Sequence, residues 1–161
     1  MKIEKYTKKY QEQVKDLLVE LQKFVIEIDE MGLNIISKEY RDKYFENMQQ
    51  NCKENQGAIF LAVENGQVYG MVAGWVEQYS DADRLVYSCP KKGLVEELIV
   101  SQTKRLHGIG NQLLNKMEKY FKQVGCQYCQ LDVFGYNERG LKFYKKNGYS
   151  DERMITLMKK F

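Results

Sequence analysis

The stretch Arg105-Leu106-His107-Gly108-Ile109-Gly110-Asn111-Gln112-Leu113-Leu114 decides the fold of this 161-residue chain. It follows an apolar run, Leu98-Ile99-Val100, that is typical of a strand, and it leads into apolar spacing that is typical of an amphipathic helix. A glycine-rich turn between a strand and a helix start exposes free backbone N–H groups, to which the helix dipole adds partial positive charge. We call residues Arg105 to Gly110 the glycine turn, and we expect it to bind a phosphate-bearing ligand.

The spacing of the two glycines in this turn argues against two common nucleotide-binding motifs. A dinucleotide-binding fold requires G-x-G-x-x-G near the start of a βαβ unit, whereas Gly108 and Gly110 come late in the chain without a third glycine. A nucleoside-triphosphate P-loop requires Gly-Lys-Ser/Thr, which is absent from this turn. A pyrophosphate site of another kind remains, and the alternative is a strand-to-helix turn that binds no ligand.

Length and charge limit the class of protein. The chain has 25 basic and 22 acidic residues, a net charge of +3 and 43% hydrophobic residues, so we expect one domain over residues 1–161 with a sizeable core. The near-neutral charge argues against a nucleic-acid partner. No apolar run is long enough to span a membrane or to form an N-terminal signal region. We therefore expect a cytoplasmic protein with no membrane partner.

The four cysteines favour structural thiols over a metal or redox site. Cys126 and Cys129 have C-x-x-C spacing, but a zinc site would need a second pair or histidines, and His107 is the only histidine. A redox pair usually opens a helix, whereas this pair leads into a strand-like run. We therefore expect no metal site.

Hydrophobic periodicity predicts an α/β fold in which a mixed sheet carries helices on both faces. Asn65-Gly66 predicts a tight hairpin, because both residues of such a turn must accept positive φ. The expected elements are a strand at 3–6, helices at 10–28 and 37–53, strands at 57–63, 67–76 and 93–100, a helix at 108–124, a strand at 129–134, a helix at 137–146 and a last strand at 149–158.

A second motif follows the glycine turn and carries a family resemblance. The pattern N-x-x-A-x-x-F-Y-x-x-x-G-F/Y is matched by Asn137, Phe143, Tyr144, Gly148 and Tyr149. Gly140 stands where alanine is usual. With R-x-x-G-x-G before it, the chain resembles the GNAT superfamily of acyl-CoA-dependent N-acyltransferases, specifically over about residues 94–158 and only in architecture before that. Leu106 replaces a frequent glycine, which is tolerable where the backbone need not take positive φ.

The resemblance implies a GNAT-like fold with a splayed central sheet, and acetyl-CoA as co-substrate. The N–H groups that would hold its pyrophosphate, beside Arg105, are those of Leu106, His107, Gly108, Ile109, Gly110 and Asn111. The backbone of Leu98, Ile99 and Val100 would pair with the pantetheine arm as an added strand does. Asn137 would either bond the amides of that arm or simply cap the helix that follows.

Candidate catalytic residues follow from the chemistry of aminolysis. Tyr144 is expected to protonate the leaving thiolate, and the alternative is a tyrosine buried beside Phe143 in the core. The attacking amine must lose a proton, for which Glu96 and Glu97 are candidates. Neighbouring strand residues face opposite sides, and Glu96 is preferred because it would share the packed apolar side. Two solvated charges, or deprotonation through water, remain alternatives.

The sequence thus predicts an N-acetyltransferase that moves an acetyl group from acetyl-CoA to a primary amine by direct attack in a ternary complex. The acceptor would be a small molecule or a peptide, and its identity stays open. The alternative is a non-catalytic acyl-CoA-binding regulatory or interaction module of the same fold. Resembling proteins are often homodimers, which makes a homodimer the expected partner, although the residues themselves leave the oligomeric state open.

Overall fold

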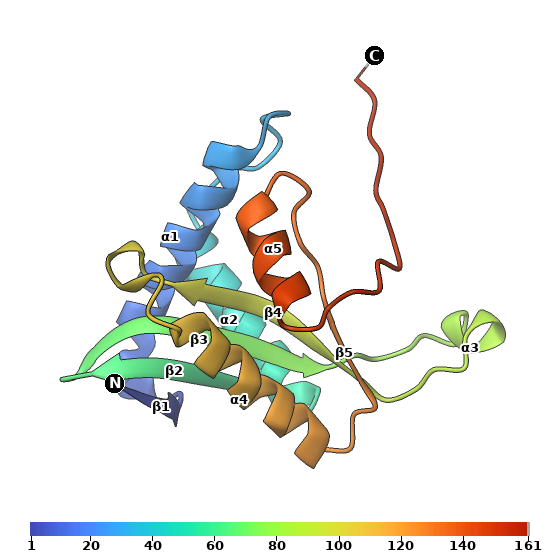
Figure 1. Ribbon diagram of the computed structural model, residues 1–161, viewed down its shortest axis with the longest axis horizontal. Coiled ribbons are helices and arrows are strands. Elements are labelled where there is room, and N and C mark those ends of the chain that lie inside the picture. The colour runs from blue at the N-terminus through green and yellow to red at the C-terminus, as the bar shows by residue number, and fades with distance from the viewer. Residues whose placement is uncertain (161) are drawn as a thin grey trace.

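The computed structural model describes residues 1–160 (Figure 1). Within these residues, five strands form one mixed sheet in the order β1-β2-β3-β4-β5. The strands are β1 (Lys2–Lys5), β2 (Ala58–Glu64), β3 (Gln67–Val76), β4 (Lys92–Val100) and β5 (Tyr128–Leu131). Neighbours from β1 to β4 are antiparallel, and β5 joins β4 in parallel. The predicted mixed sheet is confirmed.

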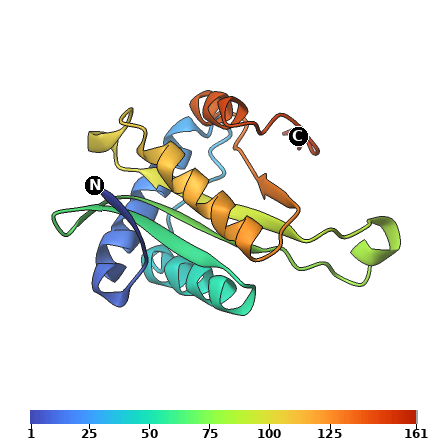
Figure 2. The ribbon, with the colours of Figure 1, turned by 60° about the horizontal axis from the view of Figure 1, so that its bottom comes forward.

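Helices cover both faces of this sheet. The helices are α1 (Gln11–Ile28), α2 (Tyr40–Glu54), α3 (Asp83–Val86), α4 (Ile109–Gln123) and α5 (Glu138–Lys146), with 3-10 turns η1 (Lys8–Tyr10) and η2 (Gln102–Lys104). Figure 2 shows α1 and α2 on one side of the sheet and α4 on the other, while α3 lies at the end of a protrusion. Over residues 1–160, none of the helices has both the length and the apolar character that crossing a membrane requires.

The sheet separates two hydrophobic cores, and β2 contributes to both. Ile59 and Leu61 point to the core under α1 and α2, whereas Phe60 and Ala62 point to the core under α4. This follows from the alternation of side chains along a strand. Full burial of each large apolar side chain contributes about 1.5–3 kcal/mol. The near-continuous apolar run of β2 is therefore the mark of a strand covered on both faces.

The ring of Phe121 on α4 lies directly on the backbone of β3 and β4. A Cβ atom added at Gly93 would come within 2.4 Å of this ring, and one added at Gly74 within 3.0 Å. Phe121 itself is only 1% exposed. The two glycines therefore allow α4 to approach the sheet at the point where β4 begins.

The hairpin between β2 and β3 is confirmed in detail. Asn65 and Gly66 both adopt positive φ, at 52° and 80°. These values suit the primed turns that match the twist of the flanking strands. The start of α2 differs from the prediction, because the helix begins at Tyr40, three residues after the expected start at residue 37, and Glu39 stands at its N-cap.

The predicted last strand at 149–158 is wrong. Tyr149 is anchored, since its hydroxyl donates to Glu118 at 2.9 Å and to Cys129 Sγ at 3.1 Å. Residues 151–160 then form no regular structure and lead away from the sheet (Figure 1), with Met154 84% and Leu157 89% exposed. Apolar residues at strand-like positions form a strand only when a neighbouring strand pairs with them through hydrogen bonds. The strand that would have to pair with them, β5, is itself shorter than predicted and has only four residues.

Replacement of Gly93 by alanine should destabilise the fold by about 1–3 kcal/mol, the usual cost of overpacking a core. The added methyl group would overlap the Phe121 ring. Urea unfolding measures the loss. Gly135→Ala is the control, because a Cβ there meets no described atom within 4 Å, and equal losses in both variants would contradict the packing argument.

Candidate functional site

The site begins where β4 and β5 diverge. The two strands pair only from Lys92 with Tyr128 to Val95 with Leu131, where β5 ends. β4 continues for five more residues to Val100, held on its other side by β3. A strand edge with free N–H and C=O groups can pair with an extended ligand. Leu98, Ile99 and Val100, which the sequence analysis expects to pair with the pantetheine arm, lie in this part of β4.

The glycine turn lies at the end of this half-paired strand and leads into α4. Its N-cap residue is Gly108, which has no side chain to cap the helix and adopts a φ of 75°. The first intrahelical bond runs from Gln112 N to Gly108 O, so the N–H groups of Ile109, Gly110 and Asn111 have no acceptor within the helix. Such an N-terminus, with open space beside Gly108, suits an anion.

Leu106 carries backbone strain that the sequence interpretation did not anticipate. Its φ is 69°, in the left-handed region, and its side chain is 92% exposed. The expectation that this position need not take positive φ is therefore wrong. Left-handed backbone costs a non-glycine residue about 1–2 kcal/mol. Strain of this kind is kept where the surrounding structure imposes it, and such positions cluster at binding sites.

Arg105 connects the glycine turn to the sheet and to α1. Its Nε donates to the Val100 carbonyl at 3.0 Å, and its guanidinium lies 5.7 Å from the Phe24 ring. Glu20 on α1 accepts a bond from Gln102 N at 2.9 Å and lies 3.9 Å from Arg105 Nη2. Arg105 therefore stabilises the conformation of the turn through contacts with β4 and α1.

His107 folds back on the same turn. Its Nδ1 lies 2.8 Å from the Arg105 carbonyl oxygen, in an exposed position. The imidazole ring thus makes a hydrogen bond within the glycine turn.

The second sequence motif packs against the first through α5. The Phe143 ring lies 3.4 Å from the place where a Cβ of Gly110 would be, and Asn147 Nδ2 donates to Asn111 Oδ1 at 3.1 Å. The two stretches that carried the family resemblance are therefore in direct contact.

Asn137 caps α5, because its Oδ1 accepts a bond from Gly140 N at 2.8 Å. A Cβ at Gly140 would come within 2.5 Å of the Asn137 amide nitrogen. An alanine at this position would therefore require the Asn137 side chain to shift. Of the two roles predicted for Asn137, the structure directly displays the cap.

Tyr144 lies on α5 between two other aromatic rings. Its ring centroid is 5.1 Å from that of Phe143 and 6.0 Å from that of Tyr149, both edge-on. Burial, and then the charge of Glu97, raise the pKa of Tyr144 to about 12. The hydroxyl is therefore protonated at neutral pH and able to donate a proton.

A bulge in β4 decides how the two candidate carboxylates lie. Ala73 of β3 is opposite Glu97 while Gly74 is opposite Val95, so β4 contains one extra residue, Glu96, at this step. Strict alternation of faces does not hold across a bulge. Besides the dominant effect of burial, the charges of both Glu97 and Glu96 raise the pKa of Tyr44 on α2.

The two carboxylates differ in environment. Glu96 is the more exposed of the two, and its pKa is raised first by partial burial of its carboxylate and then by the charge of Asp132. Glu97 is partly buried and accepts a hydrogen bond from the Tyr44 hydroxyl. Burial raises the pKa of Glu97 to about 7; the Tyr44 hydrogen bond opposes this shift, and the Glu96 charge adds to it. Glu97 can therefore exchange a proton near neutral pH.

Sequence reasoning missed the contribution of α2. Tyr40 and Tyr44 stack with ring centroids 4.9 Å apart, and Tyr44 reaches Glu97. The signal available in the sequence was their spacing of four, which places both on one helix face. Nothing in the sequence indicated which strand residue that face would meet.

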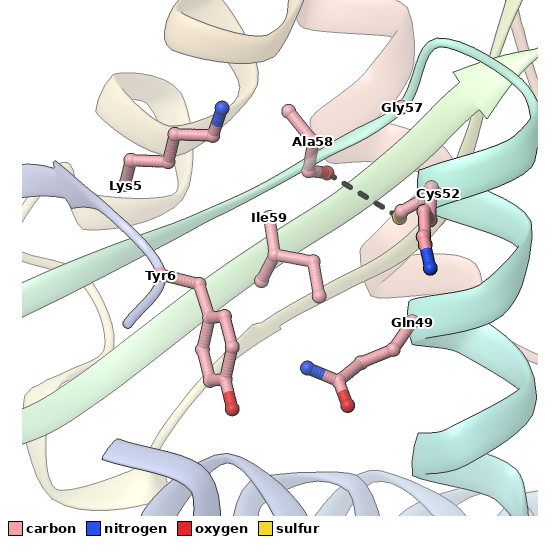
Figure 3. Close-up of a pocket in the computed structure, with 8 residues that line it drawn as sticks. Lys5, Tyr6, Gln49, Cys52, Gly57, Ala58 and Ile59 are labelled. Atoms are coloured by element: carbon pink, nitrogen blue, oxygen red, sulfur yellow. Dashed lines mark hydrogen bonds between the residues drawn. The ribbon is translucent and has the colours of Figure 1, made fainter. Parts of the chain in front are cut away.

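A small hollow of about 190 Å³ lies elsewhere, between β1, β2 and α2 (Figure 3). Tyr6, Gln49 and Cys52 line it, and the Cys52 thiol donates to the Ala58 carbonyl at 3.8 Å. Burial raises the pKa of Cys52 to about 11, which leaves the thiol protonated and unreactive. This hollow shares no residue with the glycine turn.

Comparisons with known proteins agree with this geometry. Residues 21–149 match the model of the acetyltransferase (GNAT) family. The chain is 28% identical over 107 residues to an N-alpha-acetyltransferase of Sulfurisphaera tokodaii, and this match covers 66% of the chain and 64% of that protein. The chain therefore belongs to the acetyltransferase (GNAT) family.

Solved structures support the same fold. A mutant of the BH1408 protein of Bacillus halodurans has a TM-score of 0.83 at 16% identity, with 100% of both chains covered. The aminoglycoside N-acetyltransferase AAC(6')-Iy in complex with CoA has a TM-score of 0.74 at 16% identity, covering 99% of this chain and 93% of that one. At these identities the likeness shows the fold alone.

Replacement of Leu106 by glycine should stabilise the protein by about 0.5–1 kcal/mol. The release of left-handed strain exceeds the added entropy of glycine in the unfolded chain. Urea unfolding measures the gain. Gly108→Ala is the matched control with the opposite expected sign. A Cβ at Gly108 meets nothing within 4 Å, so the φ of 75° alone should lower the stability by about 1–2 kcal/mol. A stability loss in Leu106→Gly would contradict the argument.

Proposed function

We propose that this protein is an N-acetyltransferase that transfers the acetyl group of acetyl-CoA to a primary amine. The observation that carries the proposal is the common location of three features along the part of β4 that β5 leaves unpaired. These are a free strand edge, an uncapped helix N-terminus, and a protonated tyrosine close to a glutamate of raised pKa. Family membership and the CoA complex of a structural neighbour support it.

The co-substrate would lie along β4 and the glycine turn. The N–H groups from Leu106 to Asn111 are suited to its pyrophosphate, because a helix N-terminus favours anions. The edge of Leu98 to Val100 would pair with the amides of the pantetheine arm. The amide nitrogen of Asn137 is a further donor beside that arm, since only its oxygen serves the cap. The thioester supplies an activated acetyl carbon and a thiolate leaving group.

Glu97 is the proposed general base. An alkylammonium has a pKa of about 10.4 and must lose a proton before its nitrogen can attack. A carboxylate with a pKa of about 7 is a better acceptor than an ordinary glutamate, and it is still ionised at mildly alkaline pH. The sequence argument favoured Glu96, whereas the partial burial of Glu97 and its closeness to Tyr144 favour Glu97.

Tyr144 is the proposed general acid. The N–C bond forms as the C–S bond breaks, and the Tyr144 hydroxyl gives its proton to the departing sulfur. The phenolate then recovers a proton from solvent, the new amide releases the second proton of the former ammonium group to solvent, and Glu97 releases the first. Free N–H groups of β4 beyond Val95 would stabilise the developing oxyanion. The protein thus aligns two reactants and moves protons without a covalent acyl-enzyme.

The acceptor is proposed to be a cationic primary amine, on a small molecule or a peptide. Glu97, Glu96 and Asp132 give this end of the sheet a negative character, since their charges act on one another or on the tyrosines beside them. A solved neighbour acts on aminoglycosides, and a curated relative is an N-alpha-acetyltransferase. Both kinds of acceptor present a primary amine.

Saturating acetyl-CoA should raise the melting temperature, with ATP and NAD as controls. At a hundredfold excess over Kd the linkage gain is about 2.7 kcal/mol, or roughly 5–10 °C for a domain of this size. Release of free thiol with an amine panel then measures transfer. Stabilisation without thiol release for any amine would favour an acyl-CoA-binding module, and no stabilisation would overturn the proposal.

Tyr144→Phe should lower kcat about 10²- to 10⁴-fold while acetyl-CoA still binds, because only the proton donor is lost. Steady-state thiol release and a thermal shift measure the two quantities. Tyr149→Phe is the matched control, since its hydroxyl faces Glu118 and Cys129. Similar loss of kcat in both variants would argue against a specific acid role.

A further inference from the structure

Glu97 is held by a residue from a distant part of the chain. The Tyr44 hydroxyl donates to Glu97 Oε1 across 53 positions of sequence, from α2 to β4. α2 is fixed in place by Phe45 and Met48, which are buried in the core under the sheet. The donor is therefore anchored to the fold and independent of any ligand.

Tyr44 acts as the donor to the ionised Glu97. Burial is the main cause that raises its pKa, and the charges of Glu97 and Glu96 raise it further. The phenol therefore keeps its proton throughout the range in which the enzyme would work. Its ring is held by stacking against Tyr40, with an interplanar angle of 22°.

The groups that act on Glu97 are otherwise acidic or neutral. They are Tyr40 and Tyr44 from α2, Glu96 from its own strand and Tyr144 from α5. A partly buried carboxylate without a donor is costly and becomes protonated. Among these groups, Tyr44 donates the hydrogen bond that favours the ionised form.

We propose that Tyr44 is a positioning residue for the base Glu97. The Tyr44 hydroxyl holds Oε1 of Glu97 so that Oε2 is presented to the acceptor amine. This inference rests on the proposed function, because it assigns Tyr44 a role through Glu97. The proton path is unchanged, since the acceptor ammonium gives its proton to Glu97 while Tyr44 keeps its own. Tyr44 on α2 thus sets both the orientation and the basicity of the Glu97 carboxylate.

The direction of the effect follows from the hydrogen bond. Tyr44→Phe keeps the ring and removes the donor, so the pKa of Glu97 should rise by about one unit. Tyr40→Phe is the matched control, because the Tyr40 hydroxyl donates to the Leu18 carbonyl at 3.4 Å, whereas it is the Tyr44 hydroxyl that donates to Glu97. A merely structural role of the α2 tyrosines would not separate the two variants.

The test is a carboxyl ¹³C NMR titration of Glu97 in unliganded full-length protein, with the signal assigned by Glu97→Gln. The pKa should rise in Tyr44→Phe and stay within a few tenths of a unit of wild type in Tyr40→Phe. The acidic limb of kcat against pH should move with it. If Tyr44→Phe does not fold, 3-fluorotyrosine placed at Tyr44 donates a stronger hydrogen bond and should lower the pKa of Glu97.

The titration needs no turnover, so it separates this inference from the proposed function. An unchanged pKa in Tyr44→Phe, or an equal rise in Tyr40→Phe, would overturn the role of Tyr44 even if the protein is an active acetyltransferase. A rise in the pKa of Glu97 without movement of the kcat limb would overturn Glu97 as the base and, with it, the positioning role. Movement of both supports the inference.

Discussion

The structure depends on β4 being an interior strand at its start and an edge strand at its end. β3 pairs with β4 along its length, whereas β5 stops at Leu131, opposite Val95. Unpaired backbone groups in a half-buried place must find water or a ligand. The glycine turn and the uncapped N-terminus of α4 follow this edge in the chain, after η2. A strand edge and a helix N-terminus, two features that can each bind a ligand, therefore come from one short stretch of sequence. The site is thus a consequence of how the sheet ends.

Packing on both faces keeps this opening in place. α4 is held against the sheet by Phe121, whose ring lies over Gly74 and Gly93, and α5 is held against α4 by Phe143 at Gly110. Arg105 and Glu20 brace the glycine turn from the side of α1. The strain at Leu106 is tolerated within this frame, because the contacts around the turn impose its backbone path.

The acid–base character of the site comes from burial balanced by a few hydrogen bonds. Tyr144 is kept protonated and Glu97 is brought to a pKa of about 7, in each case chiefly by burial. The charge of Glu97 adds to the shift on Tyr144, so the two groups are coupled in space. Such a pair, an acid that stays protonated and a base that titrates near neutrality, is the combination that aminolysis of a thioester requires.

Local signals predicted most of the fold and the position of the glycine turn. The Asn65-Gly66 hairpin and the glycine turn were readable because each rests on backbone geometry within a few residues. The strand at 149–158 was wrong, since a strand exists only with a neighbour to bond it, and no local pattern supplies one. The bulge at Glu96 was also invisible, because register is a property of two strands together.

The sequence by itself therefore determined the order of most elements, the family motifs and the place of the glycine turn. Only the tertiary structure decided that Glu97 meets Tyr44, that Arg105 faces inward to brace the turn, and that Leu106 is strained. The physical reason is the distance along the sequence over which each kind of interaction acts. Propensity, glycine and hydrophobic period act over a few residues, whereas the pKa of a carboxylate is set by whatever distant side chains the packing of α2 and α5 brings around it.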